Sequence, residues 1–188
     1  MYEAFRKTNE TNVNVTLYPD GQEIVIDVPV AFLGHMLELF FFNAGLGARL
    51  KASGDTCVDY HHTTEDVAIV LGRALKEMWM SQPRERYGWA VLPMDGTLVM
   101  VALDLSGRGT FVWEGSFPSP KCGDFDMELV PEFWQALSRE AALTLHIRAL
   151  SVDNSHHLAE AAFKATGRAL RAALKPGSGI ASTKGVLA

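Results

Sequence analysis

The chain has 188 residues, of which 48% are hydrophobic and 21% are charged, and its formal net charge is −5. This length can bury a substantial core, as one domain or as two small fused halves. The negative charge excludes a general polyanion-binding surface, although local basic pockets are compatible with it. No uncharged apolar run is long enough to span a bilayer, and the polar N-terminus lacks a signal-peptide core. Cys57 and Cys122 are isolated, which fits buried thiols in a reducing compartment, so we expect a cytoplasmic protein.

The first fifty residues predict two strands, a helix and a third strand. Residues 12–18 and 23–28 alternate between apolar and polar side chains, and Pro19-Asp20-Gly21 between them provides turn residues. We therefore predict a β-hairpin. Residues 31–44 carry apolar side chains at helical spacing and are followed by glycines that end a helix. A strand at 48–52 follows.

The sequence HHTTED at residues 61–66 begins a second helix, and a loop at 81–88 follows it. The remaining chain predicts three strands, a helix, another strand and a last helix. Their expected ranges are 89–92, 98–104 and 110–115 for the strands, a start near Met127 for the helix, 143–149 for the next strand and an end near Leu174 for the last helix. A tail rich in glycine and serine completes the sequence.

The pattern HHxxE occurs twice and is followed both times, at the same distance, by GRAL. The second copy lies 95 residues after the first. His61, His62, Glu65 and Gly72 recur as His156, His157, Glu160 and Gly167. Two such matches at one offset indicate an internal duplication. We interpret the chain as a single two-repeat domain, with pseudo-repeats at about 1–90 and 91–188.

Each repeat is expected to have the order β-β-α-β-α, with further strand pieces. One repeat cannot by itself bury a pair of helices on both sides. We therefore expect the helices of both repeats to form a bundle packed between two β-sheets, which is an α/β fold.

The spacing within HHxxE suits metal binding. Residues four apart lie on one face of a helix, so His61 and Glu65 can bind one ion, whereas His62 lies about 100° around the helix and serves a different site. Mixed imidazole and carboxylate ligands favour divalent manganese, iron, cobalt or zinc. The alternative is a polar first helical turn, in which Glu65 and Asp66 favour the positive helix end. Four of the six histidines belong to the two motifs, which favours the metal interpretation.

Upstream of the motifs the repeats align with an offset of 97. In this alignment His35 corresponds to Glu132, and His146 corresponds to Arg49. His146 alternates with apolar neighbours and so lies on the opposite face of its strand. We therefore predict that Glu132 is the equivalent of His35, and that His146 has a supporting or surface role.

Several longer motifs carry a resemblance to a known family. They are TNETNVNV, HML at 35–37, GD at 54–55, HHTTED, RYG at 86–88, LDLSGR at 103–108, TLHI at 144–147, NSHHLAEAAFKA at 154–165 and STKG at 182–185. In this order and along essentially the whole chain, they resemble the imidazoleglycerol-phosphate dehydratase family of histidine biosynthesis.

The resemblance implies removal of water from imidazole glycerol phosphate to give imidazole acetol phosphate. It implies two Mn²⁺ ions per active site, at subunit contacts within a homo-oligomer of twenty-four subunits, and no nucleic-acid or membrane partner. The implied metal ligands are His35, His61, His62, Glu65, His156, His157 and Glu160, and the repeat alignment adds Glu132. Glu10 matches the acid/base carboxylate, and the phosphate-binding groups match Arg86, Arg108, Lys164, Ser182 and Lys184. Supporting roles are expected for Asp66, His146 and Asn43.

The chain departs from the family pattern at Gly34, Asn43, Tyr60 and Gly96. Two interpretations follow. In the first the chain is the dehydratase. In the second it is a non-catalytic metal-binding assembly protein of the same fold, which lost turnover through the changes at Gly34 and Asn43. Glu10 favours the first interpretation, because metal binding alone does not require it.

Overall fold

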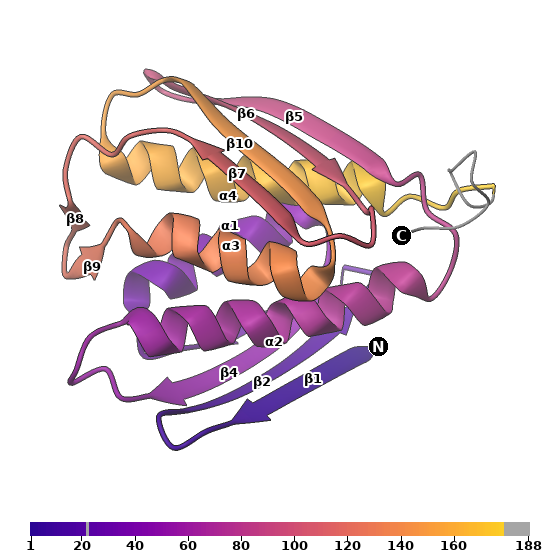
Figure 1. The fold of residues 1–188 in the computed structure, drawn as a ribbon, viewed down its shortest axis with the longest axis horizontal. Helices are drawn as coiled ribbons and strands as arrows, with labels where there is room; N and C mark the ends of the chain where they lie inside the picture. The colour runs from indigo at the N-terminus through magenta and orange to yellow at the C-terminus, as the bar shows by residue number, and fades with distance from the viewer. Residues whose placement is uncertain (22, 179–188) are drawn as a thin grey trace.

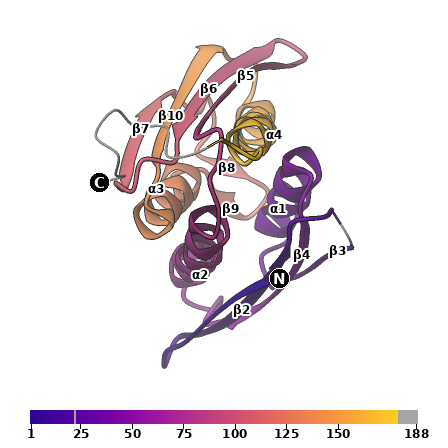
Figure 2. The ribbon, with the colours of Figure 1, turned by 90° about the vertical axis from the view of Figure 1, so that its right-hand side faces the viewer.

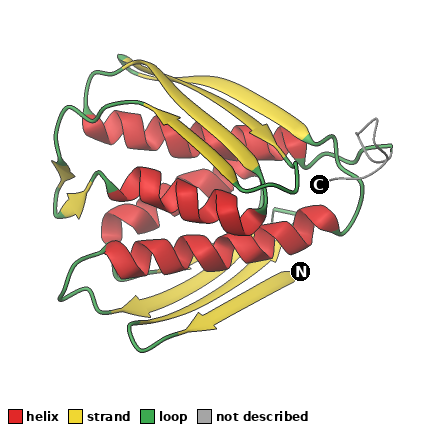
Figure 3. Ribbon diagram, in the orientation of Figure 1, coloured by secondary structure: helices red, strands yellow, loops and turns green. Residues whose placement is uncertain are grey.

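The computed structural model describes residues 1–21 and 23–178. In this part of the chain, four helices lie in a layer between two four-stranded β-sheets, as Figures 1, 2 and 3 show. The expected helix bundle between two sheets is therefore confirmed. None of the described helices is both long enough and apolar enough to cross a membrane.

The elements of the first half are three strands, a helix, a strand and a helix. They are β1 (Tyr2–Lys7), β2 (Thr11–Tyr18), β3 (Ile24–Asp27), α1 (Ala31–Ala44), β4 (Gly47–Gly54) and α2 (His61–Met80). The second half repeats this order and adds a short two-stranded hairpin. It contains β5 (Tyr87–Met94), β6 (Thr97–Asp104), β7 (Thr110–Glu114), β8 (Lys121–Cys122), β9 (Phe125–Asp126), α3 (Leu129–Ala141), β10 (Thr144–Ser151) and α4 (Ser155–Ala173).

The predicted hairpin of residues 12–18 and 23–28 is wrong. Strand β2 pairs antiparallel with β1 and β4, whereas β3 lies beyond β4 and runs parallel to it. The turn residues do reverse the chain, with Gly21 at φ 65°. They lead the chain past the position that β4 occupies to the edge of the sheet, so β3 does not pair directly with β2. Alternating side chains fit either partner, so the local sequence did not specify the pairing.

The two halves have the same topology. The strand orders are β1-β2-β4-β3 and β5-β6-β10-β7. Helices α1 and α3 both end at a left-handed residue, Gly45 and Ala142, which lie 97 positions apart. Strands β4 and β10 begin at Gly47 and Thr144, again 97 positions apart. This agreement supports the alignment that equates His35 with Glu132.

The helices pair across the two halves: α2 packs on α3, and α1 packs on α4. A glycine of each GRAL motif lies where the paired helices come closest. A Cβ atom on Gly167 would be 2.5 Å from the carbonyl oxygen of Phe40 and 3.0 Å from the amide nitrogen of Ala44. A Cβ atom on Gly72 would be 2.9 Å from the carbonyl oxygen of Leu137, which is the residue equivalent to Phe40. Both contacts are with backbone atoms, so these positions need glycine.

The arginine after each glycine also makes equivalent contacts. The Nε atom of Arg73 lies 3.0 Å from a carboxylate oxygen of Glu140, and Nε of Arg168 donates to Oδ1 of Asn43 at 3.2 Å. Glu140 and Asn43 are 97 positions apart. A single buried core, in which the rings of Phe40, Trp134 and Phe163 are in contact, joins the two helix pairs.

Candidate metal centre

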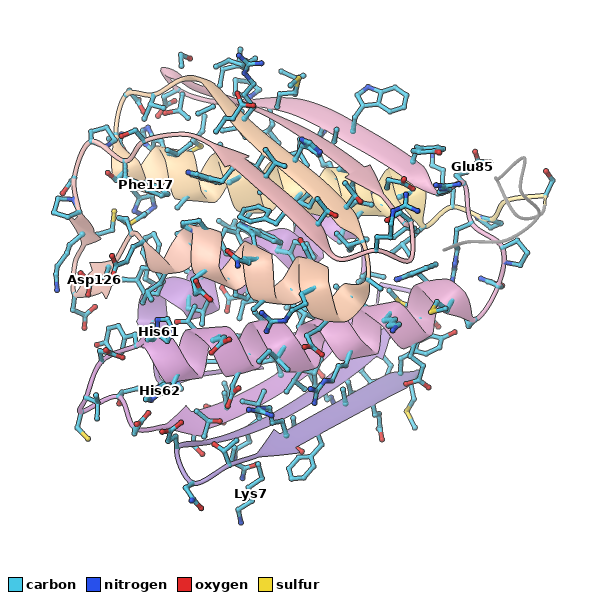
Figure 4. The ribbon with its side chains drawn as sticks, viewed as in Figure 1. Lys7, His61, His62, Glu85, Phe117 and Asp126 are labelled. Atoms are coloured by element: carbon cyan, nitrogen blue, oxygen red, sulfur yellow. The ribbon has the colours of Figure 1, made fainter. Side chains whose placement is uncertain are left out.

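All four helices begin at the same end of the molecule (Figure 1). The parallel pairs β3 with β4 and β7 with β10 bring the chain to this end before the helices begin. The first two turns of α2 and α4 carry the histidines and carboxylates of the repeated motif, and those of α1 and α3 carry His35 and Glu132. His61 and His62 lie at this end in Figure 4, while Glu85 lies at the opposite end.

One compact ligand group joins α1 and α4. His35, His156 and Glu160 each offer a ligand atom, and these atoms all lie within 4.8 Å of one another. His156 and Glu160 are one helical turn apart, with 3.3 Å between Nε2 and Oε2. Two imidazoles and a carboxylate at this spacing fit a divalent transition metal ion.

Glu160 is the buried member of this group, with 8% of its surface exposed. Burial alone would raise the pKa of its carboxyl. The hydrogen bond and positive charge of Lys164, helped by His156 and His35, outweigh burial and lower that pKa. Glu160 is therefore held as a carboxylate, the form that binds a metal ion.

The equivalent residues on α2 and α3 are His61, Glu65 and Glu132. Within residues 1–21 and 23–178, they do not form a second group as tight as the first. Glu65 instead pairs with Arg139 on α3, at 3.7 Å. The predicted His61–Glu65 pair thus lies on one helix face as expected, but its carboxylate is turned toward an arginine.

The second histidine of each motif faces a different set of groups. The rings of His61 and His62 are 6.1 Å apart and nearly perpendicular, at 87°. Nδ1 of His62 lies 3.0 Å from a carboxylate oxygen of Asp55 and 3.9 Å from one of Glu10. The hydrogen bond with Asp55 raises the pKa of His62. Neighbouring histidines therefore face different groups, and that they bind different metal ions stays a prediction.

His157 makes the equivalent contact with Asp153, whose oxygens lie 2.9 and 3.1 Å from Nδ1. The hydroxyl of Thr97 donates to this carboxylate, as do the backbone amides of Gly96 and Asn154. Thr97, with His157 and these amides, holds the pKa of Asp153 well below its usual range. Neither Asp55 nor Asp153 was predicted, because they precede their histidines by different numbers of residues.

Glu10 lies in the turn between β1 and β2, and its side chain is about half exposed. The hairpin that carries it is anchored to α2 by Asp66. Nε of Arg6 donates to Asp66 at 2.7 Å, and the hydroxyl of Thr11 donates to the other carboxylate oxygen. Asp66 is therefore placed to hold the hairpin bearing Glu10, and not within the ligand group.

The phosphate-binding candidates are divided between the two ends of the molecule. Lys164 lies beside Glu160. Arg86 precedes β5 at the far end, where its guanidinium forms a two-point contact with Asp104 at 2.7 and 3.2 Å. Arg108 lies between β6 and β7 at the same end. Ser182 and Lys184 lie outside the described residues.

The remaining candidates lie away from the ligand group. His146 is exposed on the outer face of its sheet, as predicted from its strand pattern. Asn43 lies in the last turn of α1, where it donates to the carbonyl of Leu39 and accepts from Arg168. Its contacts are those of helix pairing, equivalent to Glu140 in the other half.

An aromatic row that the sequence did not reveal connects the two halves of this end. The ring of Tyr60, next to His61, stacks with Phe125, which in turn stacks with Phe32. Phe32 meets the ring of His156 edge-on, with 5.4 Å between centroids. The Tyr60 hydroxyl donates to Asp124, and this hydrogen bond raises the pKa of Tyr60. The β8–β9 turn is thereby fixed between the two histidine motifs.

Comparisons with known proteins agree on one family. The profile described as imidazoleglycerol-phosphate dehydratase matches residues 28–170. The protein of that name from Streptococcus gordonii is 48% identical over 190 residues, covering 98% of both chains. The one from Desulforamulus reducens is also 48% identical, covering 97% of this chain and 95% of its own. The structure of imidazoleglycerol-phosphate dehydratase from Staphylococcus aureus has 40% identity and a TM-score of 0.85, covering 94% of this chain and all of its own. The structure of the Pyrococcus furiosus protein has 38% identity and a TM-score of 0.86, covering 97% of this chain and 99% of its own.

Proposed function

This chain belongs to the imidazoleglycerol-phosphate dehydratase family, and we propose that it removes water from imidazole glycerol phosphate to give imidazole acetol phosphate in histidine biosynthesis. The observation that carries the proposal is the group of His35, His156 and Glu160 beside Lys164. It combines ligands for a metal ion with a cation for a phosphate. This is the pair of functions that a phosphorylated imidazole substrate requires.

The proposed cofactor is Mn²⁺, with two ions per active site. The group on α1 and α4 would hold one ion, and the equivalent residues His61, Glu65 and Glu132 would hold the other. His62 and His157, which face away from these groups, would each contribute to an ion held mainly by another copy of the chain. When bound to a substrate imidazole, divalent metal ions stabilise negative charge on the ring.

The side chains have separate roles in the proposed reaction. The Glu10 carboxylate takes the proton from the carbon next to the one that loses its hydroxyl, and the resulting enol rearranges to the ketone. The Lys164 ammonium attracts the phosphate dianion as a point charge. Asp66 keeps Glu10 in place through the β1–β2 hairpin.

The placement of the arginines supports an active site shared between copies of the chain. The amide of Arg86 donates to the carbonyl of Ala173 at the C-terminal end of α4, and Arg108 lies in the loop between β6 and β7. At 1.5 Å per residue, Ala173 is roughly 25 Å along the helix from His156, so Arg86 is too far away to bind a substrate held there in the same chain. A neighbouring copy could bring these two guanidiniums to the ligand group. We therefore propose a homo-oligomer, of twenty-four subunits if it assembles as the family resemblance implies.

Turnover by the purified protein tests the proposed function. With Mn²⁺ and imidazole glycerol phosphate, we expect imidazole acetol phosphate as the product, detected by its new ketone. Chelation of the metal should stop the reaction, and added Mn²⁺ should restore it. A fully metallated protein that forms no product would instead support the non-catalytic metal-binding assembly protein.

The alignment of the repeats makes a separate prediction for metal content. Glu132→Gln should lower the occupancy of one of the two metal sites, because Glu132 is placed as the equivalent of His35. His146→Gln is the matched control and should leave both sites filled, since His146 lies on the outer sheet face. Metal analysis of the two purified variants decides between them. Loss of a metal only in the His146 variant would show that the alignment is wrong.

A further inference from the structure

The two histidines that face away from the ligand groups, His62 and His157, share one feature. In each ring Nδ1 lies within hydrogen-bond distance of an aspartate, at 3.0 Å for Asp55 and 2.9 Å for Asp153. The aspartates come from different positions: Asp55 precedes its histidine by seven residues and Asp153 by four. The same contact is thus reached by two different loops, and it is not a simple product of the sequence repeat.

Asp153 is itself fixed by surrounding donors. Its carboxylate accepts from the hydroxyl of Thr97, from the amide of Gly96 at 3.2 Å and from the amide of Asn154 at 2.7 Å. Gly96 leaves the necessary room, because a Cβ atom there would lie 3.0 Å from Cβ of Asp153. The carboxylate therefore cannot turn away from His157 without losing several hydrogen bonds.

A competing group lies at the same nitrogen. Nδ2 of Asn154 is 2.8 Å from Nδ1 of His157, while Oδ1 of Asn154 accepts from the His157 amide and caps α4. An amide N–H at Nδ1 would favour the tautomer with its proton on Nε2. The carboxylate favours the opposite tautomer. A charge-assisted hydrogen bond is about twice as strong as a neutral one, so Asp153 outweighs Asn154. The carboxylate of Asp95 faces Nε2 from 3.6 Å, which is beyond hydrogen-bond distance, so Asp153 at 2.9 Å determines the proton position.

We infer that Asp55 and Asp153 are positioning residues that keep the imidazole proton of His62 and His157 on Nδ1, so that Nε2 is free to bind a metal ion. The inference rests on the proposed function only in taking these two histidines as metal ligands. A carboxylate at the second ring nitrogen also fixes the ring orientation and makes the histidine a better ligand.

The test compares Asp153→Asn with Asp153→Ala. Asparagine keeps the size of the side chain but can place an N–H at Nδ1, which with Asn154 would force the proton onto Nε2. Alanine removes the carboxylate, and with it the preference for a proton on Nδ1, without adding an N–H group that favours the opposite tautomer. The His157 tautomer is read in the metal-free protein from two-bond ¹H–¹⁵N correlation spectra. Affinity for Mn²⁺ is read by electron paramagnetic resonance of the free ion.

We expect the asparagine variant to shift His157 to the Nε2–H form and to weaken one class of Mn²⁺ site by about 10- to 100-fold. The alanine variant should lose less. Ser151→Ala is the matched control. The hydroxyl of Ser151, at the end of β10, donates to the carbonyl of Gly96, whose amide donates to Asp153, but Ser151 makes no hydrogen bond with His157. This substitution should change neither readout.

A purely structural role for Asp153 predicts the reverse order, with alanine more harmful than asparagine and the tautomer unchanged in both. That result would overturn the inference. If the Asp153 variants do not fold, Asp55→Asn and Asp55→Ala make the same comparison at His62. Neither readout depends on turnover, so an inactive wild-type protein would contradict the proposed function and leave this test intact.

Discussion

Replacing Glu10 by glutamine is expected to lower turnover by about 10³-fold or more while leaving metal content unchanged. Glutamine has nearly the same shape but cannot accept the substrate proton, and a general base contributes about 10²- to 10⁴-fold to a rate. Glu10 lies on an exposed turn, and its backbone amide donates to Thr8 independently of its side chain. The substitution should therefore preserve the hairpin. Turnover and metal analysis of the same preparation check both statements.

The matched control for this prediction is Glu3→Gln. Glu3 is an exposed residue of β1, on the same hairpin, and its replacement makes the same change in charge. Its turnover should remain at the wild-type level. Activity in the Glu10 variant within tenfold of wild type would rule out this residue as the base. Loss of metal in that variant would show instead that Glu10 acts as a ligand.

Replacing Gly167 by alanine is expected to lower the free energy of unfolding by about 3 kcal/mol, at the upper end of the cost of overpacking. Alanine favours a helix over glycine by about 1 kcal/mol, so propensity alone predicts the opposite sign. The new Cβ atom would lie 2.5 Å from the carbonyl oxygen of Phe40, which cannot move aside as a side chain can. Helices α1 and α4 must separate to accommodate it. Urea denaturation of the metal-free protein measures the loss.

Gly34→Ala is the control for the stability prediction, because Gly34 is also a helical glycine. A Cβ atom there would meet only side-chain methyl groups, that of Val28 at 3.1 Å and that of Ile26 at 3.9 Å. A small rotation of Val28 can relieve this contact, so the change in stability should be within about 1 kcal/mol. Equal destabilisation by the two substitutions would mean that helix spacing at Gly167 is not the cause.

The parts of the fold that depend on local pattern could be predicted from the sequence. Helix α1 has the predicted bounds, 31–44, because apolar spacing and the glycine at its end are both local signals. The pairing of β3 was predicted wrongly, because its partner β4 is separated from it by the whole of α1. Strand β1 was not predicted, and it forms the true hairpin with β2.

For the candidate site, too, the local patterns were predicted and the contacts between distant segments were not. The repeated motif predicted the histidines of α2 and α4, and the offset of 97 predicted Glu132 as the repeat equivalent of His35. The sequence did not reveal Asp55 or Asp153, because an orienting contact depends on how each loop returns to the helix. It also did not reveal that Arg86 lies at the far end of the molecule, since position along the chain does not specify position in space.

The pairing of helices across the two halves has a consequence for synthesis on the ribosome. Helix α1 packs on α4, which is the last helix to be made, and the intervening elements must be translated first. At typical elongation rates this interval is on the order of 10 s. During that time the side of α1 that packs on α4 and on Trp134, which includes Phe40, lacks its native partners, and only β3 and β4 are available to cover the helix. The nascent chain therefore cannot complete its core half by half, and its early helices are natural substrates for chaperones that shield apolar surface.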